Sequence, residues 1–229
     1  MALRIDHARI NAAIARAEET TSGEITCVIK ARALEYPETP LVWAAAVALI
    51  APLVLFSLGL LPHQWMAPLL GLGGWYATGV TGDFTIPEAI ISYALLQLVL
   101  FAAVYAVIAF TPLRLALTPK AIKHRRAHAK AQEQFYARGL HLTAGHTGVM
   151  IFCALEERFV EVIADEGIYG KIDKDFWDAT VAALVGHIRS GDLTTGFEQS
   201  IAACGAALAG HFPPGASNPN ELPDVLIEI

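Results

Sequence analysis

Residues 41–61 read LVWAAAVALIAPLVLFSLGLL, and residues 89–113 read AIISYALLQLVLFAAVYAVIAFTPL. Neither run contains a charged residue, and the chain has no Lys or Arg between Arg32 and Arg114. As α-helices they would reach about 32 and 37 Å, enough to cross a hydrocarbon core of about 30 Å. The first run also lacks the polar stripe at 3.6-residue spacing that a long soluble helix usually carries. We therefore predict a transmembrane hairpin over 39–113, with spans 41–61 and 89–113 joined by the connection 62–88.

The basic residues on either side of the hairpin predict its orientation. Lys and Arg resist translocation and accumulate on the cytoplasmic flank of membrane spans. The only charged residues in the connection are Asp83 and Glu88, whereas both flanks are basic. Both termini are therefore predicted to be cytoplasmic. The flanking basic residues are Arg4, Arg9, Arg16, Lys30 and Arg32 before the hairpin, and Arg114, Lys120, Lys123, Arg125, Arg126 and Lys130 after it.

The connection allows two alternatives, because Met66–Val80 is apolar and rich in glycine. This stretch could enter the membrane as a re-entrant or interfacial segment, or it could form a third span. A third span is disfavoured, since the stretch is short and would leave one strongly basic flank outside the cell. The first residues, MALRIDHARIN, lack the apolar core of a secretory signal, so the hairpin is expected to act as a permanent anchor.

The segments before and after the hairpin are expected to form one split α/β domain. Residues 1–38 show a helical pattern and then an alternating strand around Ile25–Ile29, and so short a segment rarely folds alone. Residues 114–212 supply a basic neck helix, strands at 147–154 and 158–164, and two further helices. Both ends of a membrane hairpin emerge on the same side, so the two halves can share a sheet. The Pro-rich residues 213–229 are predicted to be a flexible tail.

Three stretches carry a family resemblance: GEITCVIK at 23–30, TGVMIFCALEERFVEVIADEGI at 147–168, and DFWDATVAALVGHIRSGDLTTGFEQSI at 175–201. With them, Gly167 and the turn from Gly191 to Gly196 make the chain resemble the TPM domain family, the DUF477-type membrane proteins of bacteria. The resemblance covers about half of the chain. It implies an α/β/α sandwich, a short mixed sheet with helices on both faces, with the anchor inserted within the domain. It also implies a place in the bacterial inner membrane.

Asp165 and Glu166 are the leading candidates for a ligand site. They follow a predicted strand and precede Gly167, in a loop at the end of the sheet, where open α/β folds commonly bind ligands. A hard cation such as Ca²⁺ or Mg²⁺ requires several oxygen ligands, and Asp192 could join the two acids. The alternative is that all three are ordinary solvated turn residues. Further acids at the start of the next helix are interpreted as helix-capping residues: Asp173, Asp175 and Asp178.

Other kinds of site have less support in the sequence. His124 and His128 are four residues apart on one helix, but no HExxH glutamate accompanies them and nearby basic side chains would repel a metal cation. The sequence has no P-loop, no GxSxG motif and no GxGxxG motif after a strand. The cysteines share no disulfide or metal spacing and are predicted to be buried, small apolar residues: Cys27, Cys153 and Cys204.

Charge is distributed unevenly along the chain, which has a formal net charge of −6. From Arg114 to Lys130 there are six basic residues and no acid, which favours contact with anionic lipid beside a span. From Glu133 onward there are 14 acidic and 5 basic residues, which disfavours nucleic acid as a partner.

Family members resemble membrane-protein repair factors, divalent-cation binders and, in one case, a weak acid phosphatase. We expect a non-enzymatic adaptor for an unknown protein partner, or a divalent-cation-binding module. The alternative is a metal-dependent phosphatase that uses the three candidate acids.

Overall fold

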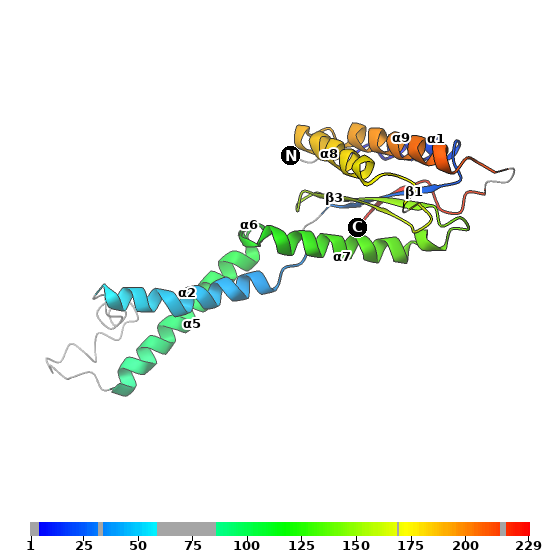
Figure 1. Cartoon of the computed structure of the whole chain (residues 1–229). Coiled ribbons are helices and arrows are strands. Elements are labelled where there is room, and N and C mark those ends of the chain that lie inside the picture. The colour runs from blue at the N-terminus through cyan, green and yellow to red at the C-terminus, as the bar shows by residue number, and fades with distance from the viewer. Residues whose placement is uncertain (1–4, 32–33, 59–85, 169, 216–218) are drawn as a thin grey trace. The chain divides into compact units, whose positions relative to one another are not determined.

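The computed structural model describes all residues except 1–4, 32–33, 59–85, 169 and 216–218. The chain divides into two units: Met1–Leu34 together with Lys120–Ile229, and Glu35–Pro119. The first, called here the α/β unit, contains every strand of the described residues (Figure 1). The second, the apolar unit, contains two long helices.

A four-stranded mixed sheet forms the centre of the α/β unit, in the order β3-β2-β1-β4. Strand β1 pairs in parallel with β2 on one side and with β4 on the other, and β2 pairs with β3 in antiparallel orientation. The register of the first pairing runs from Glu24↔Gly148 to Lys30↔Ala154. The strands are β1 (Glu24–Lys30), β2 (Gly148–Ala154), β3 (Phe159–Ala164) and β4 (Leu226–Glu228).

Helices cover both faces of this sheet, as Figure 1 shows. One face carries α1 (His7–Glu18), α8 (Lys174–Ser190) and α9 (Leu193–His211), and the other carries α7 (Lys120–Ala137), which the short η1 (Leu140–Leu142) follows. Alternate residues of β1 enter separate cores: Cys27 packs with the first group of helices, and Val28 packs with α7. Strand residues therefore face a core on both sides, which explains why β2 (GVMIFCA) is apolar throughout and does not alternate. The predicted α/β fold, with helices on both faces of a short mixed sheet, is confirmed.

Capping residues define the ends of the helices. Asp6 caps α1, because its carboxylate accepts a hydrogen bond from the backbone N–H of Arg9 at 3.1 Å. Asp173 caps α8 in the same way, and Gly191, with φ of +83°, ends that helix in the left-handed conformation that glycine adopts without strain. The turn that follows leads directly into α9.

The apolar unit contains α2 (Glu38–Ser57), α5 (Ile86–Phe110) and the short α6 (Leu113–Leu117). Within these helices, Glu38–Leu55 and Tyr93–Phe110 are long and apolar enough to cross a membrane. Helices α2 and α5 pack against each other. Both helices begin and end about three residues before the predicted spans 41–61 and 89–113, because hydropathy locates an apolar run but not the turns that bound it. The alternatives for Met66–Val80 concern residues outside the described ones.

The C-terminal segment differs from the flexible tail predicted for residues 213–229. Residues 226–228 form β4, which pairs with β1, and the side chain of Leu226 is only 6% exposed. Beyond it, the backbone N–H of Ile229 donates to the carbonyl oxygen of Ile29 at 2.9 Å. Three residues after a Pro-rich connector are too few to show the alternation that identifies a strand in sequence.

Candidate functional site

Asp165, Glu166 and Gly167, which together are called the acid turn, follow β3 directly. The backbone N–H of Asp165 donates to the carbonyl oxygen of Gly148 at 2.9 Å, and its side chain is largely buried. Its Oδ1 accepts from the backbone N–H of Glu166 at 2.8 Å, and its Oδ2 lies 3.2 Å from Nδ1 of His146. Glu166 is exposed, so one acid of the turn is held by the fold and the other faces solvent.

Two glycines allow the backbone segments around the acid turn to approach closely. A Cβ atom on Gly148 would lie 2.4 Å from the carbonyl oxygen of Leu140, and one on Gly167 would lie 2.4 Å from that of His146. Neither position has space for a side chain. The Gly148 and Gly167 that carry part of the family resemblance therefore have a structural role: Gly148 lets the start of β2 lie against Leu140, and Gly167 lets the acid turn lie against residues 145–146, which places His146 beside Asp165.

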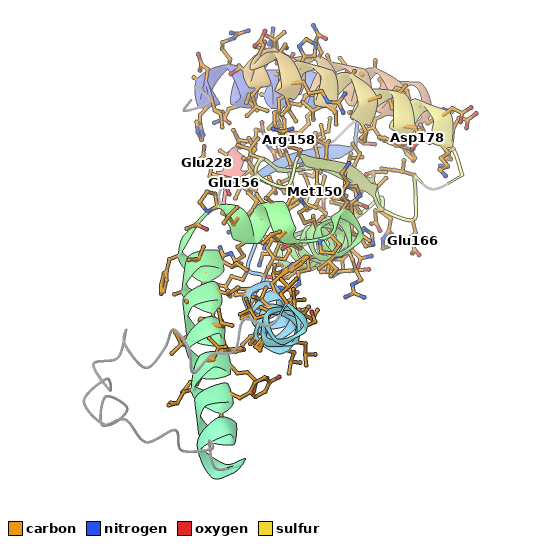
Figure 2. The ribbon with its side chains drawn as sticks, turned by 90° about the vertical axis from the view of Figure 1, so that its left-hand side faces the viewer. Met150, Glu156, Arg158, Glu166, Asp178 and Glu228 are labelled. Atoms are coloured by element: carbon orange, nitrogen blue, oxygen red, sulfur yellow. The ribbon has the colours of Figure 1, made fainter. Side chains whose placement is uncertain are left out.

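The structure places Asp192 at the other end of the sheet from the acid turn. Asp192 caps α9, and Oγ1 of the nearby Thr194 accepts from the backbone N–H of Asp6 at 3.1 Å. Helix α1 begins immediately after Asp6, and its first side chain contacts Glu228. Figure 2 shows Glu228 and Glu166 at opposite ends of the sheet. The three candidate acids are thus not gathered at one point.

In the described part of the chain, no group of three or more His, Cys, Asp or Glu residues is arranged to hold a metal ion. The acid turn offers two carboxylates, and that of Asp165 already has a histidine and a backbone N–H as neighbours. Binding of Ca²⁺ or Mg²⁺ by Asp165 and Glu166 stays a prediction. The expected capping role of Asp173 is confirmed, since its Oδ1 accepts from the N–H of Asp175 at 3.2 Å.

Glu24, at the start of β1, holds the C-terminal segment against the sheet. Its two carboxylate oxygens accept from the backbone N–H groups of Glu221 and Leu222, each at 3.2 Å. Asn11 adds a third contact of this kind, because its Oδ1 accepts from the N–H of Leu226 at 2.8 Å. Sequence reasoning missed these roles, since nothing local in the sequence distinguishes Glu24 or Asn11 from surface residues.

Glu18, at the end of α1, lies in the same acidic region. Its Oε1 accepts from the backbone N–H of Ile25 at 2.7 Å. Burial raises the pKa of Glu18 from 4.5 to about 9; the Ile25 N–H opposes this shift, and a hydrogen bond with Asp224 adds to it. Burial also raises the pKa of Glu24. At neutral pH Glu18 is therefore a protonated carboxyl group, and it can donate its proton to Asp224.

The basic helix α7 exposes two of its cationic side chains, Lys120 and Arg125. The residues that it buries are Ala127, Ala131, Gln134 and Phe135, of which all but Gln134 are small or apolar. The helix is thus amphipathic, with one face in the core and a cationic face in solvent.

The histidines of α7 contact β3 rather than forming a metal site with each other. The ring of His124 packs beside that of Phe159, with centroids 5.3 Å apart. Nδ1 of His128 lies 2.7 Å from Oε1 of Glu161. The spacing of four residues therefore places both side chains along β3, which is an edge strand of the sheet.

All three cysteines are free and buried, as the sequence predicted. Burial raises the pKa of Cys153 and that of Cys204 to about 12, and raises that of Cys27 well above its ordinary value. A thiol of so high a pKa is a poor nucleophile at neutral pH, because the thiolate is the reactive form.

Comparison with known proteins adds a similarity of fold. No protein-family profile matches the sequence, and no curated protein matches it. The structure is similar to the NMR structure of the BA42 protein from the psychrophilic bacterium Bizionia argentinensis, with a TM-score of 0.53. The match covers 97% of this chain and 92% of that chain, with 18% identity. At this identity the similarity concerns the fold alone.

Proposed function

We propose that the protein is an integral membrane protein of the TPM family, anchored by α2 and α5, whose α/β unit acts as a non-enzymatic adaptor on the cytoplasmic side of the bacterial inner membrane. The sequence resemblance supports the family, and the α/β fold described above agrees with what that resemblance implies. The charge distribution supports the orientation, because basic residues lie on both flanks of the hairpin.

One contact within the apolar unit carries the proposal. Oγ1 of Thr39, near the start of the unit, lies 2.8 Å from Oγ1 of Thr118, near its end. Beside this pair, Nε1 of Trp43 donates to the carbonyl oxygen of Leu117 at 3.4 Å. The chain therefore enters two apolar helices and leaves them at one point, which is the geometry that an anchor inserted within a domain requires.

The side chains of α2 and α5 support a lipid environment. Large apolar residues are highly exposed along both helices, including Leu53 at 61%, Leu98 at 63% and Val99 at 60%. Exposed apolar surface of this extent is unfavourable in water and marks contact with lipid or protein. The cationic face of α7 would add attraction to anionic headgroups of about 1 kcal/mol for each basic residue near the surface.

For the partner of the adaptor, we propose a basic protein surface that contacts the acid turn. Glu166 is exposed there, while the contacts of Asp165 hold the backbone of the turn in place. The acidic balance of the chain after Glu133 favours a basic partner. The phosphatase alternative has less support, since the three acids that it requires are divided between the two ends of the sheet.

Membrane fractionation and cysteine labelling of the full chain test this proposal. The protein is expected to stay in the membrane fraction after alkaline carbonate extraction. In spheroplasts, an impermeant maleimide should label a cysteine placed within residues 62–88, but should label Lys171→Cys only after the membrane is permeabilised. Release by carbonate, or labelling of Lys171→Cys in intact spheroplasts, would contradict the anchor or its orientation. Loss of co-purifying protein in Glu166→Lys, but not in Glu156→Lys, an exposed acid at the other end of the sheet, would support the partner surface.

A further inference from the structure

Helix α5 carries a line of polar and aromatic side chains along one side. Tyr93, Gln97, Phe101 and Tyr105 are spaced four residues apart, so each lies beside the next and the line winds slowly around the helix. The rings of Phe101 and Tyr105 are stacked, with centroids 6.2 Å apart and an interplanar angle of 12°. We call these four residues the polar stripe. It places three hydrogen-bonding side chains on a helix whose sequence is otherwise almost wholly apolar.

Gln97 differs from the described Ser57 and Thr111 side chains of the apolar unit, each of which has a hydrogen-bond partner in its own helix. Ser57 donates to the carbonyl oxygen of Val54 at 2.8 Å, and Thr111 donates to that of Val107 at 2.5 Å. Each of these hydroxyl groups is thus satisfied by its own helix. Among the described residues, the Gln97 carboxamide has no hydrogen bond, and its two donors and its acceptor are all available.

The stripe also lies where a neighbouring helix could reach it. Leu96 is buried against α2, whereas Gln97 and Phe101 are only partly buried and Tyr105 is 37% exposed. Lipid tails cannot form hydrogen bonds, so a carboxamide left unpaired in hydrocarbon is costly, and a hydrogen bond to another helix removes that cost.

We propose that the polar stripe is the contact surface for a second copy of this chain in the membrane, with the Gln97 carboxamides of the two copies hydrogen-bonded to each other. This inference rests on the proposed membrane insertion. A carboxamide both donates and accepts, so it is complementary to itself, and two Gln97 side chains can form a pair of hydrogen bonds. Two copies inserted with the same orientation present α5 in parallel. A twofold axis along the membrane normal then brings Gln97 opposite Gln97, with the aromatic residues above and below it.

The first test is self-association of the full chain in lipid vesicles, measured by energy transfer between labelled copies over a range of protein-to-lipid ratios. The wild-type chain is expected to associate. Gln97→Leu should associate about five- to thirtyfold more weakly, which corresponds to the loss of an interhelical hydrogen bond in a membrane. Gln97→Asn keeps the carboxamide and should retain most of the association. Val99→Leu, a change at an exposed position on another side of α5, should have no effect and is the matched control.

The second test is disulfide crosslinking in native membranes. Phe101→Cys lies on the stripe and should form crosslinked dimers on mild oxidation, whereas Val99→Cys should not. A wild-type chain that is monomeric in vesicles, or a Gln97→Leu variant that associates as strongly as wild type, would overturn the inference. Carbonate extraction separates this result from failure of the proposed function. A chain retained in the membrane but monomeric refutes only the paired stripe, whereas a chain released from the membrane refutes the anchor itself.

Discussion

A Cβ atom on Gly167 would lie 2.4 Å from the carbonyl oxygen of His146, a distance that no side chain can occupy without moving the backbone. Gly167→Ala is therefore expected to separate the acid turn from the loop that carries His146. We expect it to lower the free energy of unfolding by about 1–3 kcal/mol, the usual cost of overpacking. Urea denaturation of the full chain in detergent measures this change.

The control for that substitution is Gly186, in the interior of α8. A Cβ atom there would have no neighbour within 4 Å. Gly186→Ala should therefore stabilise the protein by about 0.5–1 kcal/mol, because alanine favours a helix interior more than glycine does. Equal effects of the two substitutions would mean that the close contact at Gly167 does not determine its role.

Glu18 predicts a dependence of stability on pH. Its pKa is raised from 4.5 to about 9 in the folded state, mainly by burial. Between these values the folded state holds one more proton than the unfolded state, so the stability of the fold falls as pH rises from about 4.5 to about 9. Glu18→Gln should reduce this slope, and the variant should become more stable than the wild type toward pH 8. Chemical denaturation at a series of pH values gives the slope.

Glu19, which follows Glu18 in the sequence and is exposed, provides the control. Glu19→Gln removes a carboxyl group that is exposed to solvent, so it should leave the pH slope of the wild type unchanged. An unaltered slope in Glu18→Gln would show that burial of this carboxyl group is not the cause.

The hydrogen bond between the Thr39 and Thr118 hydroxyl groups predicts that replacing these two residues lowers stability by different amounts. Oγ1 of Thr118 lies 2.7 Å from the carbonyl oxygen of Arg114 and donates to it, so the hydroxyl of Thr39 is the donor within the threonine pair. Thr118→Val removes two hydrogen bonds and leaves the buried Thr39 hydroxyl without its acceptor, whereas Thr39→Val removes one. Thr118→Val should lower the unfolding temperature more. A double-mutant cycle should give a coupling of about 0.5–1.5 kcal/mol. Independent effects of the two substitutions would contradict the pairing.

Removal of the hairpin tests whether the α/β unit folds by itself. Residues 1–34 joined to residues 120–229 by a short Gly/Ser linker contain both cores described above. This chain should be soluble and should unfold cooperatively, measured by circular dichroism during thermal unfolding. Residues 120–229 alone lack β1, the strand that pairs with both β2 and β4, and should not unfold cooperatively. A cooperative transition in the shorter chain would show that β1 is dispensable.

Features with a local signal could be predicted from the sequence. The capping residue Asp173 and the left-handed Gly191 bound α8, and both act through residues only a few positions away. The pairing of Glu24 with the backbone of Glu221 and Leu222 could not be predicted, since it depends on segments about 200 residues apart.

The place of Asp192 could not be predicted for a related reason. Helix α8 begins a few residues after the acid turn, and Figure 2 shows Asp178 and Glu166 at the same end of the sheet. Its 17 residues then extend by about 26 Å, at about 1.5 Å per residue, before the turn that holds Asp192. Two turns that are neighbours in sequence are thus placed at opposite ends of the sheet by the length of one helix.

The pairing of β1 fixes an order of events during biosynthesis. Glu24 pairs with Gly148, which is synthesised 124 residues after it. Cys27 pairs with Leu226, which is synthesised 199 residues after it. Under the membrane insertion proposed above, α2 and α5 reach the insertion machinery while β1 has neither neighbour. On that proposal, a delay in insertion prolongs the exposure of a strand with two open edges, so slow insertion should lead to aggregation of the incomplete chain.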